Sequence, residues 1–264
     1  MYAFDYHRPA SLAEALAAFQ GDSRYLAGGQ SLIQAMKLRL SASERLVDLG
    51  ALPGMAEISV ADDRVTIGAM TRHAQVANSP VLKQHLPALA ELAHGIGDPM
   101  VRSMGTLGGA LANADPAACY PAAVLGLAAT VHTATRDIPG EAFFTGLYGT
   151  ALEAGELITA VSFPVTACAA YVKFKQPASR FALVGVMVAR GPAGVRVAVT
   201  GACDHVFRAS DLEAALSERF TPEAARACQV QQEGLLSDLH ASAAYRAAMI
   251  PVITARAVQL ALSR

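Results

Sequence analysis

One glycine-rich stretch decides how the chain is interpreted: Gly97-Asp98-Pro99-Met100-Val101-Arg102-Ser103-Met104-Gly105-Thr106-Leu107-Gly108-Gly109-Ala110-Leu111-Ala112-Asn113-Ala114-Asp115-Pro116. A shorter stretch of similar character precedes it, Ala27-Gly28-Gly29-Gln30-Ser31-Leu32. Both place hydroxyl or amide side chains beside glycines, which lets main-chain N–H groups approach a phosphate. Neither is a common nucleotide loop, because the chain contains no G-x-G-x-x-G and no G-x-x-x-x-G-K-[ST]. The two stretches therefore have to be interpreted together.

Composition sets the class of protein. The chain has 264 residues, of which 53% are apolar and 16% charged, so it can bury one large core or two to three modest ones. A net charge of −1 argues against a nucleic-acid or polyanion partner. The N-terminus has charges and no apolar run typical of a signal peptide, and the longest uncharged stretch is too rich in glycine for a membrane span. We expect a cytoplasmic protein.

The four cysteines give no metal-site pattern. They are Cys119, Cys168, Cys203 and Cys228, and no two form C-x-x-C. A zinc site or an iron–sulfur cluster held by this chain alone is therefore not expected. The scattered histidines and carboxylates also form no catalytic triad or acid pair, so we predict no catalytic and no metal-ligating residue here.

Strand and helix patterns alternate over the first ~50 residues. A capping-box match at Ser11-Leu12-Ala13-Glu14 predicts a helix over 12–19. Short strands are predicted at 24–27 and 45–48, with a helix over 31–38 between them. The turn at Gly28-Gly29 thus leads from a strand into a helix N-terminus, which is a favourable place for an anion.

In the middle of the chain, the sequence pattern predicts a hairpin of strands 58–60 and 64–67, which turns at Asp62-Asp63. Helices are predicted from the cap Thr71 to Val76, again from Ser79-Pro80, and on through 85–93. The stretch 97–116 has too many glycines for a regular helix. A short helix over 121–128 and strands over 129–135 and 157–163 complete this part.

After a linker at 165–169 the pattern changes. Strands are predicted at 171–175, 181–189 and 195–202, with a turn at Gly191-Pro192-Ala193-Gly194. Helices are predicted at 211–216, 222–228 and 243–262, the last kinked or interrupted by Pro251. The chain is therefore predicted to be α+β: a nucleotide-type region over 1–165, then a smaller domain over 170–264 with a three-stranded antiparallel sheet and helices.

Both glycine stretches match one known family. The first, followed by Met36-Lys37-Leu38-Arg39, and the second, running on through Ala117, resemble the two flavin-binding segments of the FAD-binding medium subunit of molybdenum hydroxylases, of the carbon monoxide dehydrogenase and xanthine dehydrogenase type. Further matches occur in the family's order over nearly the whole chain: Ile67-Gly68-Ala69-Met70-Thr71, Phe143-Phe144-Thr145-Gly146, Gly155-Glu156-Leu157-Ile158, Lys173-Phe174-Lys175 and Phe181-Ala182-Leu183-Val184-Gly185-Val186.

This resemblance implies a two-subdomain FAD-binding fold of the vanillyl-alcohol-oxidase (PCMH) type, with subdomains at about 1–55 and 56–165. It also implies that the domain over 170–264 is of the carbon monoxide dehydrogenase flavoprotein type. In such proteins a large subunit carries a molybdenum–pterin centre and a small subunit carries [2Fe-2S] clusters. This chain would be an oxidoreductase subunit whose FAD takes electrons from the clusters and passes them to an external acceptor. The expected assembly is a dimer of heterotrimers.

The resemblance also implies which residues bind FAD: Ala27, Gly28, Gly29, Gln30, Ser31, Leu32, Gly105, Thr106, Gly108, Gly109, Asn113, Asp115, Cys119, Ile158, Lys175 and Phe181. The first six would hold the pyrophosphate, and Thr106, Gly108 and Gly109 would form the other half of that cradle. Asn113 and Asp115 would contact the ribityl chain or ribose, although Asp115 is equally suited to cap a helix. The resemblance places Ile158, Lys175 and Phe181 at the flavin ring. Alternatively, Ile158 and Phe181 are core residues and Lys175 is a solvated charge.

Two positions depart from the family pattern. Cys119 stands where an acid that contacts the cofactor is usual, and a thiol is a weaker hydrogen-bond acceptor. Ser103 stands where Asn is common.

Two other functions remain open: a self-sufficient flavin-dependent dehydrogenase or oxidase of related fold, and a scaffold that has lost the cofactor. The sequence names neither the substrate of the complex nor its electron acceptor.

Overall fold

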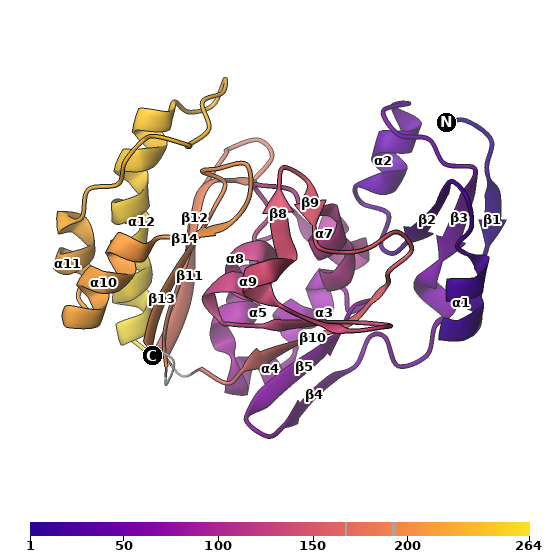
Figure 1. The fold of residues 1–264 in the computed structure, drawn as a ribbon. Coiled ribbons are helices and arrows are strands. Elements are labelled where there is room, and N and C mark those ends of the chain that lie inside the picture. Colours follow the sequence, from indigo (N-terminus) through magenta and orange to yellow (C-terminus); the bar gives the residue numbers. More distant parts are fainter. Residues whose placement is uncertain (167, 192–193) are drawn as a thin grey trace.

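The computed structural model describes residues 1–166, 168–191 and 194–264. Figure 1 shows three sheets that follow one another along the chain, from the N-terminal one at the right to the C-terminal one at the left. A small hairpin, β8 (Phe144–Gly146) and β9 (Gly149–Thr150), lies apart from them. The two chain ends lie on opposite sides of the molecule.

The N-terminal sheet is parallel, with strand order β1-β3-β2. Its elements are β1 (Asp5–His7), α1 (Leu12–Ala18), β2 (Ser23–Leu26), α2 (Leu32–Lys37), β3 (Arg45–Asp48) and the 3-10 turn η1 (Leu49–Ala51). Ser11 caps α1 as predicted, since Glu14 N–H donates to Ser11 Oγ. The reciprocal bond of a capping box is not formed, because the Glu14 carboxylate accepts the N–H of Ala10 and not that of Ser11. The predicted strand–helix alternation is confirmed. As a result, the edge strand β2 delivers the first glycine stretch to the C-terminal end of a parallel sheet, where such folds bind ligands.

The middle sheet is antiparallel, with order β4-β5-β10-β6-β7. Its strands are β4 (Ile58–Ala61), β5 (Arg64–Gly68), β6 (Thr130–Thr133), β7 (Asp137–Pro139) and β10 (Ile158–Pro164). The predicted hairpin is confirmed, and Asp62 and Asp63 turn it with φ values of 49° and 57°. This sheet brings the strand before the second glycine stretch next to the strand that carries Ile158.

This middle part of the chain also contains seven helices among the described residues: α3 (His73–Asn78), α4 (Pro80–His85), α5 (Pro87–His94), α6 (Pro99–Met104), α7 (Leu107–Asn113), α8 (Tyr120–Gly126) and α9 (Gly140–Phe143). Three predictions were wrong here. The helix over 85–93 breaks at Leu86, because Pro87 lacks an N–H and starts a new helix. Arg72 rather than Thr71 is the N-cap of α3. The stretch 97–116 contains two regular helices, α6 and α7.

Capping explains why α6 and α7 form despite their glycines. Asp98 Oδ1 accepts the N–H of Val101, and Thr106 Oγ1 accepts the N–H of Gly109. Gly108 and Gly109 lie in the first turn of α7, where Leu107 and Gly108 are fully packed. The caps and this burial outweigh the entropy cost of glycine, about 1 kcal/mol per residue in a helix.

The C-terminal sheet has order β11-β12-β13-β14 and is antiparallel. It contains β11 (Cys168–Lys175), β12 (Ala182–Gly191), β13 (Gly194–Thr200) and β14 (Phe207–Arg208), followed by α10 (Ser210–Glu218), α11 (Pro222–Ala227) and α12 (Ala243–Leu262). The three predicted strands are present, and the short β14 adds a fourth. Part of the predicted linker, Cys168 and Ala169, belongs to β11 instead. Of the other linker residues, Val165 and Thr166 belong to no strand, and residue 167 lies outside the described residues, as do the turn residues Pro192 and Ala193.

Pro251 does not interrupt α12, which runs through it without a break. Its ring is buried in a helix that packs on β11, β12 and α11. This tertiary packing compensates the hydrogen bond that proline removes.

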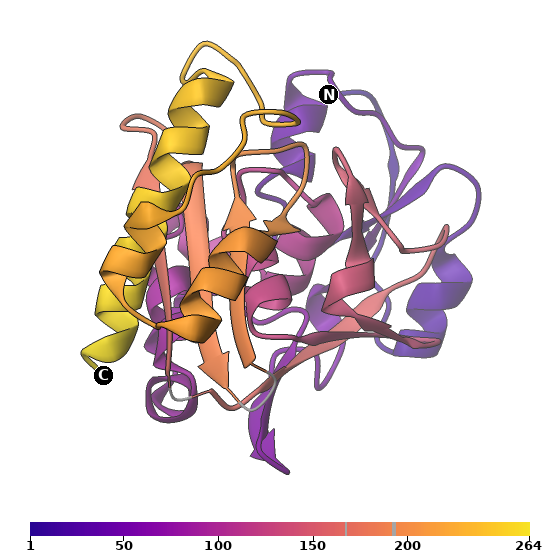
Figure 2. The same cartoon turned by 60° about the vertical axis from the view of Figure 1, so that its left-hand side comes forward.

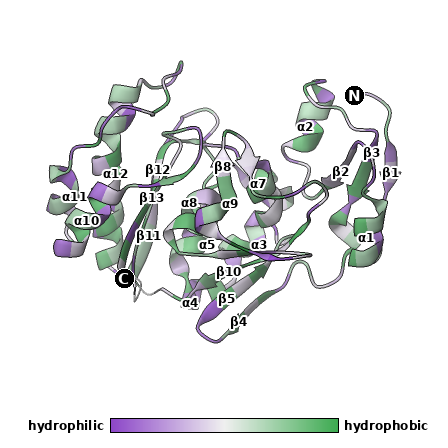
Figure 3. Ribbon diagram, viewed as in Figure 1, coloured by the Kyte–Doolittle hydropathy of each residue, from purple (hydrophilic) through white to green (hydrophobic). Residues whose placement is uncertain are grey.

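The C-terminal sheet is buried on both faces (Figure 2). Val184, Val186 and Val188 of β12 pack under α10–α12, whereas Met187 and Ala189 belong to the core shared with α5 and α8. The strands of this sheet are accordingly largely green in Figure 3. This double burial explains the nearly continuous apolar run of β12.

Candidate functional site

The structure brings the two glycine stretches into contact. A Cβ atom on Gly28 would lie 2.1 Å from the Met104 carbonyl oxygen and 2.9 Å from Gly105 Cα. A Cβ atom on Gly109 would lie 3.3 Å from Ala27 Cβ. Glycine at position 28 therefore permits an approach of the two backbones that any side chain would prevent, and Gly109 leaves room for the Ala27 side chain. One stretch comes from the parallel sheet and the other from α6 and α7.

The first stretch presents free backbone donors. Among the residues that the structure describes, none accepts a hydrogen bond from the N–H groups of Gly28, Gly29, Gln30, Ser31 or Leu32. Ser31 is the N-cap residue of α2, but its hydroxyl caps nothing, and Gly29 has φ +69°. Unpaired N–H groups at a helix start form a site for an anion such as a pyrophosphate.

The second stretch uses its amides internally. Leu107 N–H donates to Thr71 O (3.0 Å), Gly108 N–H to Ala69 O (2.8 Å) and Gly109 N–H to Thr106 Oγ1 (3.2 Å). A Cβ on Gly108 would lie 2.6 Å from Ala69 Cβ. Tight packing thus accounts for Gly108 itself. The predicted contacts of Thr106, Gly108 and Gly109 with a cofactor stay predictions. The three amide hydrogen bonds fix the start of α7, which packs against the first stretch.

Asn113 and Asp115 lie at the end of α7, which Ala114 ends in a left-handed conformation (φ 46°). Asp115 Oδ1 accepts the N–H of Ala117, and Tyr148 OH lies 3.5 Å from Asp115 Oδ2. Asp115 therefore shapes a turn, and the helix after it begins at Tyr120. Burial raises the pKa of Asp115. The Asn113 side chain forms no hydrogen bond within the described ranges, so it is available to a ligand.

Cys119 is buried, with 6% of its surface exposed, at the N-cap of α8. Lys173 Nζ donates to Cys119 Sγ at 3.4 Å and to Arg180 O at 2.7 Å. The cation near Cys119 is thus Lys173, which lies in the motif Lys173-Phe174-Lys175 and has no predicted role. Lys175, predicted to lie near the flavin ring, is exposed next to a bulge between Phe174 and Lys175 that interrupts the register of β11. Its contact with the ring stays a prediction.

The other two predicted ring contacts differ in exposure. Ile158 is 4% exposed and lies in the core at the start of β10, where the pairing with β6 is irregular. Phe181 is 48% exposed and ends a loop that Gln176 N–H closes onto Phe181 O. Arg180 of this loop donates to Gly97 O (3.3 Å), so the loop lies on the start of the second glycine stretch.

Sequence reasoning missed His73, which is buried directly behind the second stretch. Its backbone N–H donates to Gly105 O, and its side-chain Nε2 would lie 2.5 Å from a Cβ on Gly105. Burial, with a smaller contribution from the Arg102 guanidinium, lowers the pKa of His73 to about 4. A neutral imidazole thus occupies the space that a side chain at position 105 would need, and this makes glycine necessary there. A lone histidine in a helix start gives no such signal in sequence.

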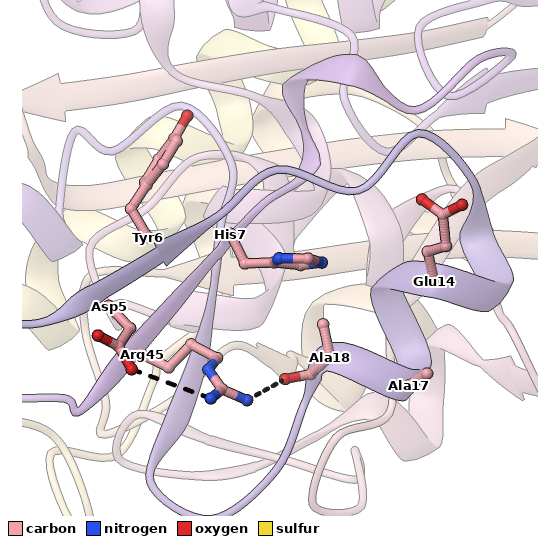
Figure 4. Close-up of a pocket in the computed structure, with 7 residues that line it drawn as sticks. All are labelled: Asp5, Tyr6, His7, Glu14, Ala17, Ala18 and Arg45. Atoms are coloured by element: carbon pink, nitrogen blue, oxygen red, sulfur yellow. Dashed lines mark hydrogen bonds and ion pairs between the residues drawn. The ribbon is translucent and has the colours of Figure 1, made fainter.

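A surface hollow lies elsewhere, next to the N-terminal sheet. It measures about 470 Å³ and is lined by Asp5, Tyr6, His7, Glu14, Ala17, Ala18 and Arg45 (Figure 4). Arg45 is already engaged there, since its Nη1 donates to Ala18 O (3.3 Å) and its Nη2 lies 4.0 Å from Asp5 Oδ2. None of the predicted site residues lines it.

Two further findings concern only residues 1–166, 168–191 and 194–264. No three His, Cys, Asp or Glu side chains come together there in a way that would hold a metal ion. Within the same residues, every helix is too short or too polar to cross a bilayer.

Comparisons with known proteins show the family and the fold. Residues 2–166 match the family described as the FAD binding domain in molybdopterin dehydrogenase. The chain is 34% identical to the nicotine 6-hydroxylase medium subunit of Paenarthrobacter nicotinovorans, over 97% of this chain and 96% of that protein. It is 33% identical to the carbon monoxide dehydrogenase medium chain of Hydrogenophaga pseudoflava, over 99% and 98%.

A solved structure shows the same fold. Quinoline 2-oxidoreductase from Pseudomonas putida 86 contains a chain that superposes with a TM-score of 0.90 at 30% identity, covering 99% of this chain and 98% of that one. The fold that the resemblance implied is therefore confirmed. The chain belongs to the family of FAD-binding domains of molybdopterin dehydrogenases, and it is an oxidoreductase medium subunit whose cofactor is FAD.

Proposed function

We propose that this chain is the electron-transfer subunit of a multi-subunit molybdenum hydroxylase. In this role it takes electrons from [2Fe-2S] clusters on a small partner subunit and passes them to an external acceptor. A large partner subunit oxidises the substrate at a molybdenum–pterin centre. The proposed assembly is a cytoplasmic dimer of heterotrimers. Two relatives that this chain matches over nearly their whole length are named as a medium subunit and a medium chain, which supports this division of labour.

The row of unpaired N–H groups from Gly28 to Leu32 carries the proposal. These donors lie at the end of β2 and against the second glycine stretch, where a pyrophosphate would receive several hydrogen bonds at once. A protein that had lost its cofactor would leave five adjacent backbone donors without a function. Bound FAD supplies the reversible uptake of electrons.

The other predicted contacts extend from this point. We assign Ala27 to the same cradle and Gly105, Thr106, Gly108 and Gly109 to holding its opposite wall. Asn113 and Asp115 are proposed to contact the ribityl or ribose hydroxyls, since both lie at the open end of α7. Ile158, Lys175 and Phe181 are proposed ring contacts. In this proposal the domains are 1–165 and 170–264, and Cys119 borders the site without accepting a strong hydrogen bond.

Replacing Gly28 by Val tests the cradle. A side chain there would meet Met104 O at 2.1 Å and separate the two stretches. We expect the purified variant to lose its flavin absorbance and to bind added FAD at least about tenfold more weakly, corresponding to about 1.4 kcal/mol. The matched control is Gly191→Ala, whose Cβ would meet only Thr166 Cγ2 at 3.9 Å. This control should keep FAD.

Circular dichroism establishes that both variants are folded. A folded Gly28→Val protein with unchanged FAD affinity would refute the cradle. The electron-transfer role needs a second measurement on the whole complex. Substrate added without any external acceptor should bleach the flavin, and the isolated chain should show no bleaching with the same substrate. Bleaching of the isolated chain would instead identify a self-sufficient dehydrogenase.

A further inference from the structure

Cys119 and Lys173 form an unusual pair in the interior. The thiol is 6% exposed, and the lysine Nζ lies 3.4 Å from its sulfur. Among the described residues Lys173 has no carboxylate within ion-pair distance, and its other contact is the carbonyl of Arg180. The amine of Lys173 thus faces an oxidisable sulfur rather than a carboxylate.

A third group completes the cluster. The Tyr171 hydroxyl lies beside the same sulfur and is fully buried, without a partner in hydrogen-bond geometry among the described residues. Burial, and then the neighbouring Cys119, raises the pKa of Tyr171 well above its usual value. The hydroxyl therefore stays protonated and is free to donate to an oxygen atom placed on the sulfur. Tyr171 and Lys173 project from the same strand, β11, towards the residue that precedes α8.

We propose that Cys119 and Lys173 are an oxidant-responsive modification site, at which peroxide produces a covalent sulfur–nitrogen cross-link between the two side chains. In the first step the Cys119 sulfur attacks one oxygen of hydrogen peroxide. The O–O bond breaks, the sulfur is oxidised to a sulfenic acid, and the other oxygen leaves as water with the thiol proton. The Lys173 ammonium favours this step, because it stabilises negative charge on the attacking sulfur.

In the second step Lys173 Nζ, after releasing a proton to solvent, attacks the sulfenic sulfur. The S–O bond breaks, the oxygen leaves as a second water with a proton from the amine, and an S–N bond remains. This step needs no further oxidant. Two equivalents of an added thiol reverse the link, giving back the thiol and the amine and forming one disulfide. Because Nζ and Sγ lie 3.4 Å apart, only a short movement of the lysine is needed.

The cross-link would fasten the segment before α8 to β11. It would also weaken the hydrogen bond that Lys173 donates to Arg180 O, on the loop that contacts Gly97. The proposal concerns only side chains of this chain and does not depend on FAD or on a partner subunit.

Peptide mapping provides the test. The purified full-length protein, with whatever cofactor and subunits it retains, is treated with hydrogen peroxide, digested with trypsin without reductant, and analysed by mass spectrometry. We expect peptide 103–136, which contains Cys119, joined to peptide 137–175, with two hydrogen atoms fewer than the sum. Trypsin should fail to cut after Lys173 in the joined species, and added thiol should restore both peptides.

Variants separate this link from other products. Cys168→Ser is essential, since Cys168 lies in peptide 137–175 and a disulfide with Cys119 would have the same mass; the link should persist in this variant. Lys173→Arg keeps the positive charge but removes the nucleophilic amine, so oxidation should stop at a sulfenic acid that a β-diketone reagent traps. Lys175→Arg, two residues further on, should leave the link intact.

The outcomes against the proposal are equally defined. Oxidation of Cys119 with normal cleavage after Lys173 would overturn it. So would a Cys119 that peroxide leaves unmodified, or a link that survives in Lys173→Arg or disappears in Cys168→Ser. The wild-type map alone decides the first two cases, so the test holds even if a variant fails to fold.

Discussion

The buried imidazole of His73 makes the stability of this protein sensitive to pH. Its Nδ1 has no hydrogen-bond partner within the described ranges, and Arg102 is a nearby cation, so the folded chain disfavours the protonated ring. The pKa is lowered from 6.5 to about 4. The unfolded chain therefore binds more protons between these two values, and stability is complete above pH 6.5 and falls as the pH drops towards 4.

We expect His73 to account for a loss of about 3 kcal/mol in the free energy of unfolding across that range. Urea unfolding of the wild type and of His73→Gln at a series of pH values measures it, because glutamine does not titrate. The difference between the two proteins should change with pH only below about 6.5. Parallel pH curves for the two proteins would show that His73 is not buried in its neutral form.

Arg246 is a second buried residue that acts through several partners. It is 2% exposed; its Nη1 donates to Leu183 O and Gly201 O, and its Nη2 to Asp238 Oδ2, each at 2.6 Å. Arg246→Met leaves two buried carbonyls without donors, so we expect a loss of about 2–4 kcal/mol in unfolding free energy. Arg256→Met, on the exposed side of the same helix, should change it by less than about 0.5 kcal/mol. Equal effects of the two would contradict this account.

At the level of elements, the N-cap of α7 links stability to cofactor binding. Thr106 Oγ1 accepts the Gly109 N–H at 3.2 Å, and Thr221 Oγ1 accepts the Ala224 N–H of α11 at the same distance. Each Thr→Val change should therefore cost about 1 kcal/mol of stability. Only Thr106→Val should also weaken FAD binding, by about fivefold, since α7 forms one wall of the proposed site. FAD titration of both variants measures this difference. Equal FAD affinities of the two variants would show that α7 does not contribute to the cofactor site.

The elements that sequence predicted well are those with local signals. These signals act on neighbours within a few residues, and each predicted structure is present: the helix cap at Ser11, the turn at Asp62-Asp63 and the helix start at Ser79-Pro80. The helix through Gly108 and Gly109 was missed, because its first amides bond to carbonyls at Ala69 and Thr71, far away in the chain.

The candidate site was predictable to the same degree. The glycine stretches were recognisable one at a time, whereas their contact depends on the fold. Lys175 was assigned to the flavin ring by resemblance alone, and that assignment stays a prediction, while the bulge beside it leaves no mark in the sequence pattern. The contact between Lys173 and Cys119 depends on packing between β11 and the start of α8, which no local pattern encodes.

At the scale of the molecule, small residues set how closely the C-terminal sheet approaches the middle helices. Gly126 ends α8 facing Met187 of β12 and Ala198 of β13, both fully buried. Charged contacts join the same two parts, since Glu141 pairs with Arg196 and Arg208. These partly exposed ion pairs are worth little individually, so apolar contacts, among them the one at Gly126, provide most of the docking energy.

A double-mutant cycle tests this contact. A Cβ on Gly126 would lie 2.7 Å from Met187 Cγ, so Gly126→Val should push the sheet away and cost about 1–3 kcal/mol. Met187→Ala alone leaves a cavity and should cost about 2–5 kcal/mol. In the double variant the valine fills that cavity, so the combined loss in urea unfolding should be at least about 1 kcal/mol smaller than the sum of the single losses. If the losses instead add to within about 0.5 kcal/mol, Gly126 and Met187 are independent and the sheet is held against the helices by other contacts.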